Sequence, residues 1–99
     1  MPMLHVAWLR FKPGISAERI DAHLAACRGL VGKVPVVRTL QCGHNLSNRA
    51  EGLTHGIVVT LDDYALLPAY LEHPAHLAVV TGLKEDIAEL RVMDIQCSA

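Results

Sequence analysis

The sequence is poor in aromatic side chains and contains no run of charges of one sign. Its aromatic residues are Trp8, Phe11, Tyr64 and Tyr70. Nine basic and ten acidic residues are spread along the chain and leave a net charge of −1. Proteins that bind nucleic acid usually present a basic stripe, and those that bind single strands add aromatic rings on which bases stack. We therefore expect no nucleic acid partner.

Long apolar runs and paired cysteines are also missing. No apolar stretch approaches the ~20 residues that a membrane span needs, and the first residues lack the basic start and apolar core of a secretory signal. Cys27, Cys42 and Cys97 are odd in number and show no CxxC spacing, which favours neither a disulfide framework nor an iron–sulfur site. We expect a protein without membrane contact, located in the reducing cytoplasm, whose cysteines act as small apolar side chains.

What the chain does contain is apolar material. Its 99 residues correspond to one domain, residues 1–99, since chains this short rarely hold two cores. A domain of this size hides only roughly 60–70% of the surface that its unfolded chain exposes. Yet 52% of the residues are hydrophobic and only 19% are charged. This excess of apolar side chains indicates association with a partner.

Four segments have the composition and alternation of strands: residues 4–12, 36–42, 54–61 and 89–97. A helix is expected between the first two, because Ser16 is a good N-cap and apolar residues then recur at helical spacing up to residue 30 or 31. We expect Gly32 to close this helix and Pro35 to prevent its resumption.

A second helix is expected between the third and fourth strands. Asp62 and Asp63 would cap it, and Pro68 or Pro74 would bend or restart it before it continues over residues 75–83. The order β-α-β-β-α-β predicts an α+β fold, a ferredoxin-like sandwich in which a four-stranded antiparallel sheet carries two helices on one face.

The strand pattern predicts a homodimer. Two helices cover only one face of such a sheet, but the first, third and fourth strands are apolar on both faces. The uncovered face would form an exposed apolar patch large enough to require a partner, and a second copy related by a two-fold axis is the simplest one. The residues expected in this patch are Leu4, Val6, Trp8 and Val58.

The segment of residues 70–76, YLEHPAH, concentrates titratable side chains at the start of a helix. Pro74 suits a first helical position, which places His73 at the N-cap and His76 one turn into the helix, on the same face as Val79 and Val80. Tyr70 precedes them. A histidine fixed on an otherwise apolar helix face is either a hydrogen-bonded core residue or part of a site.

Strand parity and helical spacing direct further residues toward the layer between sheet and helices. With Tyr70 and His76 they would line one pocket, in which His76 acts as a base and Tyr70 orients it or donates to an oxyanion. No metal or cofactor is needed for this chemistry. The expected substrate-contacting residues are His5, His23, His55 and Ile57.

The chain resembles the stress-responsive A/B barrel (Dabb) family. Residues 5–12, HVAWLRFK, followed by Pro13-Gly14, are similar to the first strand of that domain. Residues 43–47, GHNLS, and 54–59, THGIVV, are similar to its second and third strands, and residues 70–76 resemble its most recognisable segment. The resemblance implies a dimeric α+β barrel.

The resemblance leaves the activity open. Some plant members of the family cyclise linear polyketides without a cofactor, using a histidine and a tyrosine that correspond to His76 and Tyr70, whereas other members are stress-induced and structural. The wider group includes cofactor-independent monooxygenases and haem enzymes. His23 and Cys27 are not the bulky aromatic residues that would pack a long polyketide, which does not favour the cyclase activity.

Two alternatives to a catalytic site remain at this stage. His5 and His76 could bond each other or a backbone carbonyl in a small polar cluster of the core, with Tyr70 filling space. His73 and His76 could also place two nitrogens near one metal ion, but zinc sites usually need three or four ligands, and no Asp or Glu is evident among the histidines as a further ligand. The sequence therefore predicts a Dabb-type homodimer that either acts on a small carbonyl or phenolic compound without cofactors or serves as a non-catalytic stress or binding protein.

Overall fold

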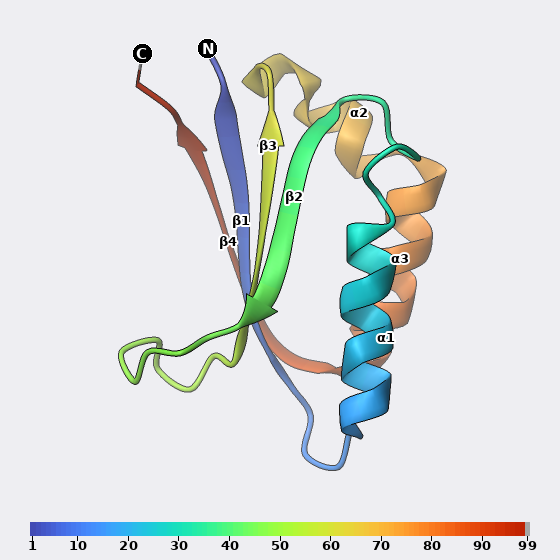
Figure 1. Cartoon of the computed structure of the whole chain (residues 1–99), viewed down its shortest axis with the longest axis vertical. Coiled ribbons are helices and arrows are strands. Elements are labelled where there is room, and N and C mark those ends of the chain that lie inside the picture. The colour runs from blue at the N-terminus through green and yellow to red at the C-terminus, as the bar shows by residue number, and fades with distance from the viewer. Residues whose placement is uncertain (99) are drawn as a thin grey trace.

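Four strands form one antiparallel sheet whose order is β2-β3-β1-β4 (Figure 1). The computed structural model describes residues 1–98. Along the chain the elements are β1 (Met3–Phe11), α1 (Ala17–Arg28), β2 (Val37–His44), β3 (His55–Leu61), the short 3-10 helix η1 (Tyr64–Leu66), α2 (Leu67–Leu71), α3 (Pro74–Asp86) and β4 (Ile87–Gln96).

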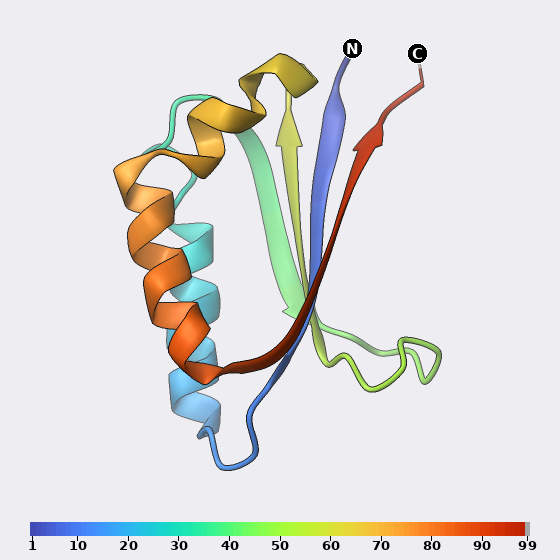
Figure 2. The same ribbon diagram turned by 180° about the vertical axis from the view of Figure 1, so that it is seen from behind.

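All helices lie on one side of this sheet, and the connection between β2 and β3 projects from the other side (Figures 1 and 2). The expected ferredoxin-like α+β architecture is therefore confirmed. The segment between β3 and β4 divides into η1, α2 and α3, so the expected restart of the second helix takes place at Pro74. Asp63 caps η1 by accepting from the amide of Ala65, and Pro74 begins α3 at a position where its missing N–H costs nothing.

The strand register confirms which residues face the helices. His5 pairs with Val59 and Ala7 with Ile57, so the odd-numbered residues of β1 and β3 share one face. This face forms the core with the helices, and its most deeply buried members are Met3, Leu9, Val59 and Leu61 together with Val34 from the α1–β2 connection.

The opposite face of the sheet stays apolar without a helix to cover it. Val6 lies between Val58 of β3 and Met93 of β4. Trp8 on this face is 40% exposed, Met93 is 46% exposed and Ile95 is 40% exposed. Of the four residues expected in the patch, Trp8 is exposed, Leu4 and Val58 are partly buried, and Val6 is buried within the single chain.

Element boundaries differ from the expected ones by a few residues. Ser16 is the N-cap of α1, as expected, and accepts from the amide of Arg19 at 3.1 Å. The helix ends at Arg28, earlier than the expected end at Gly32. Gly29 follows Arg28, and glycine has a poor helix propensity. Strand β2 continues through His44, which pairs with His55, although the expected strand ended at residue 42.

None of the helices formed by residues 1–98 is long and apolar enough to cross a membrane.

Candidate functional site

A cavity of about 370 Å³ lies between the helix-facing side of the sheet and α1, α2 and α3. Its wall is mostly apolar, with side chains such as Leu9, Ile57, Val79, Leu83 and Leu90. A small set of polar residues also reaches it. These are His5, Tyr70, His76, Lys84 and Asp94. A largely apolar cavity with a few convergent polar groups is typical of a small-molecule site.

Tyr70 and His76 meet at one end of this cavity. Tyr70 belongs to α2 and His76 to the first turn of α3, and the break between the two helices brings their rings to 4.4 Å between centroids. Tyr70 is only 3% exposed, and burial, with a smaller effect of Cys27, raises the pKa of Tyr70 to about 12. The phenol is therefore protonated at neutral pH and can donate a hydrogen bond.

His76 is held in one tautomer by the backbone. Its Nδ1 lies 3.0 Å from the carbonyl oxygen of Leu71, and a carbonyl only accepts, so Nδ1 carries the proton and Nε2 keeps a lone pair. Burial lowers the pKa of His76 below its ordinary 6.5; the Leu71 carbonyl opposes this effect and a charge on His5 reinforces it. The imidazole is therefore neutral at pH 7 and able to accept a proton.

His5 forms a pair with Asp94 beside this Tyr70–His76 arrangement. The two residues are direct cross-strand partners in β1 and β4, and Nδ1 of His5 lies 2.5 Å from Oδ1 of Asp94. The ring of His5 is 5.8 Å from that of Tyr70, in an edge-on orientation. The contact with Asp94 restricts rotation of the imidazole ring and so fixes the direction of its second nitrogen. Carboxylates orient histidines in this way in many sites.

Asp94 was missed from the sequence. The signal was nevertheless present, because Asp94 shares strand parity with Leu90 and Val92, both of which face the helices. A carboxylate on an otherwise apolar strand face needs a partner, and the expectation that no acidic residue lies near the histidines is wrong.

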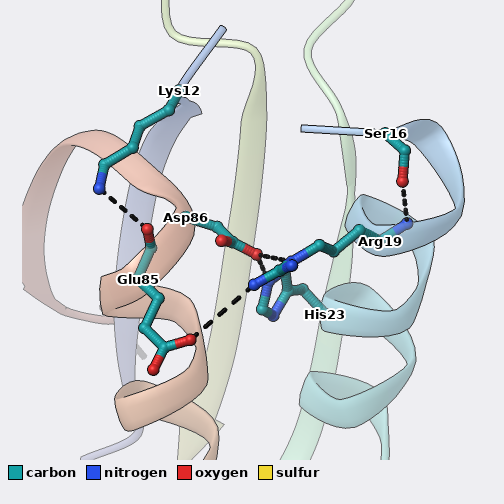
Figure 3. A network of polar contacts seen from close by, with 6 residues as sticks. All are labelled: Lys12, Ser16, Arg19, His23, Glu85 and Asp86. Carbon is teal, nitrogen blue, oxygen red and sulfur yellow. Dashed lines mark hydrogen bonds and ion pairs between the residues drawn. The ribbon is translucent and has the colours of Figure 1, made fainter. Parts of the chain in front are cut away.

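His23 does not join this cavity. Its Nε2 lies 2.6 Å from Oδ2 of Asp86, and Arg19 donates to the same oxygen through Nε at 2.5 Å (Figure 3). Asp86 is only 2% exposed, and the hydrogen bonds from His23 and Arg19 hold its pKa below the ordinary value. The ring of His23 also stacks on Phe11 at 5.8 Å. The expectation that His23 lines the pocket is wrong, because this ion-pair network joins α1 to the end of α3.

His55 also lies apart from the cavity, at the far end of β3. Its ring packs edge-on against Phe11 at 5.2 Å and lies 4.3 Å from the ring of His44. Nδ1 is 2.8 Å from the Thr54 hydroxyl, while the buried Nε2 has no hydrogen-bond partner within residues 1–98. Burial and the neighbouring His44 lower the pKa of His55. His55 borders a separate, open hollow of about 660 Å³ beneath the β2–β3 connection, so its expected place in the pocket is wrong too.

The remaining histidine of the 70–76 segment has a local role. His73 is the N-cap of α3, and its Nδ1 accepts from the amide of Ala75 at 3.1 Å. Among the residues that the structure describes, no group of three or more His, Cys, Asp or Glu side chains is arranged to hold a metal ion. Of the predicted site residues, the fold thus brings together His5, Ile57, Tyr70 and His76.

The model of the stress-responsive A/B barrel domain family matches residues 3–97, and this chain belongs to that family. It is 27% identical over 95 residues to the stress-response A/B barrel domain-containing protein HS1 of Arabidopsis thaliana, covering 94% of this chain and 87% of that protein. It is 28% identical over 79 residues to olivetolic acid cyclase of Cannabis sativa, covering 78% of each.

Solved structures share the fold over nearly the whole chain. A hydroxynitrile lyase from Passiflora edulis superposes with a TM-score of 0.90 at 21% identity, covering 99% of this chain and 95% of that one. A dimeric ferredoxin-like protein of unknown function from Thermobifida fusca superposes with a TM-score of 0.86 at 21% identity, covering 98% and 92%. At these identities the similarity establishes the fold.

Proposed function

We propose that this protein moves a proton on a small, mostly apolar carbonyl or phenolic compound, without a cofactor. The observation that carries the proposal is the cavity of about 370 Å³ in which the buried side chain of Tyr70 and the neutral imidazole of His76 share one end. A filled core in the same place would have left these side chains no substrate to act on.

The proposed step uses both groups at once. Nε2 of His76 takes a proton from the carbon next to the substrate carbonyl, and the electron pair of that C–H bond moves into the carbonyl, whose oxygen becomes an enolate oxygen. The Tyr70 hydroxyl donates a hydrogen bond to that oxygen and keeps its own proton, in agreement with its raised pKa. The imidazolium then returns the proton to carbon or oxygen.

His5 and Ile57 are proposed to contact the substrate. His5, oriented by Asp94, would offer a polar contact beside Tyr70, and Ile57 an apolar one from the sheet. The names of two similar proteins, olivetolic acid cyclase and hydroxynitrile lyase, are those of small-molecule enzymes and support a catalytic role. The proposal does not extend to the substrate of either one.

The test measures, by NMR in D2O, how fast deuterium replaces the C2 protons of ethyl 3-oxohexanoate. The wild-type protein should accelerate the exchange. His76→Gln should remove roughly 10²–10⁴-fold of this acceleration while its amide can still reach the Leu71 carbonyl. Tyr70→Phe should lower the rate by about 10²-fold or more. His73→Asn is the matched control, since it changes a neighbouring histidine outside the cavity and should retain the full rate.

A non-catalytic role is the second candidate, and one observation favours it. His76 is bonded to the Leu71 carbonyl and His5 to Asp94, as expected of polar residues that only support a core. In that case His76→Ala should lower the free energy of unfolding by about 1–3 kcal/mol, with no exchange activity to lose. A wild-type protein that never exceeds the buffer rate would remove the catalytic proposal for this type of substrate.

The proposal includes a homodimer formed by the helix-free face of the sheet. This face carries the expected patch residues Leu4, Val6, Trp8 and Val58, continued on β4 by Met93 and Ile95. Exposed apolar patches of this kind mark interaction surfaces. The similar protein from Thermobifida fusca is described as dimeric, which supports a second copy of this chain as the partner.

A further inference from the structure

The cavity carries opposite charges at its two ends. Asp94 lies with His5 at the end that holds Tyr70 and His76, whereas Lys84 lines the other end from the last turn of α3. Eight residues of helix separate His76 from Lys84, which corresponds to about 12 Å. The cavity is therefore elongated and electrically asymmetric.

Lys84 is a cation that no side chain of residues 1–98 neutralises. The two acidic residues that follow it are engaged elsewhere: Asp86 with Arg19 and His23, and Glu85 with Arg19 at 3.8 Å. The wall between Lys84 and His76 is apolar, formed on α3 by Val79, Val80 and Leu83. An unpaired cation at the end of an apolar channel is the arrangement that recognises an amphiphilic anion.

The exposed residues of β4 indicate where such a ligand would lie. Leu90 and Val92 face the cavity from this edge strand, yet each is 51% exposed. An acyl chain running from His76 toward Lys84 would cover both side chains. The reverse orientation would place the negative group of the ligand beside the carboxylate of Asp94, and two neighbouring negative charges repel each other.

We infer that the cavity binds an extended acyl compound whose anionic end, a carboxylate, lies at Lys84 and whose carbonyl lies between Tyr70 and His76. The carbonyl end of this inference rests on the proposed function. The anionic end rests on the placement of Lys84 and Asp94 and is tested separately.

The test is calorimetric titration with two probes of equal chain length, octanoate and octan-1-ol. Wild-type protein should bind octanoate roughly two- to fivefold more tightly than octan-1-ol, the size expected for a charge pair that water partly reaches. Lys84→Met keeps the length and apolar character of the side chain, so it should abolish this preference by weakening the binding of octanoate. Lys33→Met, which removes an exposed lysine outside the cavity, should change neither. Raising the salt concentration to 1 M should shrink the wild-type preference.

Two outcomes would overturn the inference: equal binding of both probes by the wild type, or a preference for octanoate that survives in Lys84→Met. Both are independent of the exchange experiment. If ethyl 3-oxohexanoate exchanges in a His76-dependent manner while the carboxylate preference is absent, the acid–base proposal stands and the anionic subsite falls. If the preference follows Lys84 but no exchange occurs, the cavity is a binding site for acyl anions without the proposed chemistry.

Discussion

Trp8 should decide whether two copies of the chain associate. Its side chain is 40% exposed on the helix-free face of the sheet. A whole tryptophan presents up to about 250 Å², so roughly 100 Å² would become buried at the interface. At about 25 cal/mol per Å², this area contributes ~2.5 kcal/mol per protomer. A two-fold dimer contains two copies of Trp8, so Trp8→Ala should weaken association by about 5 kcal/mol, or three to four orders of magnitude in Kd.

The assay is sedimentation velocity over a concentration series. The wild type should sediment at twice the chain mass of 10.8 kDa, and Trp8→Ala should shift to the monomer at the same concentrations. Tyr64→Ala is the matched control, because Tyr64 is also a large exposed side chain, 60% accessible, but belongs to η1 and not to a strand of the sheet. A wild type that is monomeric at tens of micromolar, or a Trp8→Ala variant with an unchanged Kd, would refute the assignment of this face.

Three further results are expected. Because burial lowers the pKa of His76, kcat/KM for exchange measured from pH 4.5 to 8 should fall on the acid side with a midpoint below 6.5; a midpoint above 7 would contradict the assigned base. Tyr70, whose pKa is raised from 10.0 to about 12, stays protonated in the fold while the unfolded chain ionises, so the free energy of unfolding should fall by up to ~2–3 kcal/mol as pH rises between these values. Urea titrations of the wild type and Tyr70→Phe test this, since the variant should lose that part of the pH dependence. His73→Ala should cost about 0.5–2 kcal/mol in thermal or urea unfolding as a lost N-cap, and His73→Asn should restore most of it.

The architecture could be predicted because a side chain on a strand can point to only one of the two faces of the sheet. Side chains alternate between faces, so an apolar residue at every position of a strand requires cover on both sides. The placement of His5 and Ile57 toward the helices and of Val6 and Val58 away from them followed from parity alone and agrees with the register. Helix ends were less predictable, since the choice between Gly29 and Gly32 depends on the turn that follows.

Parity could not place a histidine along the strand. His55 has the predicted face, but the register sets His5 opposite Val59, four residues further along β3. Four residues of strand correspond to about 13 Å, which separates His55 from the Tyr70–His76 end of the cavity. Similarly, helical spacing predicted that His23 faces the core but gave no indication that its ring would contact the carboxylate of Asp86. The partners of His5 and His23 lie 89 and 63 residues away in the chain, a separation that only the folded topology resolves.

The pairing of β1 with β4 has a consequence for how the candidate site forms during folding. The first and last strands of the chain each supply one member of the His5–Asp94 pair, so a nascent or clipped polypeptide that lacks the final strand holds only half of it. Lys84 and the β4 wall of the cavity likewise follow every other lining residue along the chain. The cavity is therefore complete only when β4 has joined the sheet.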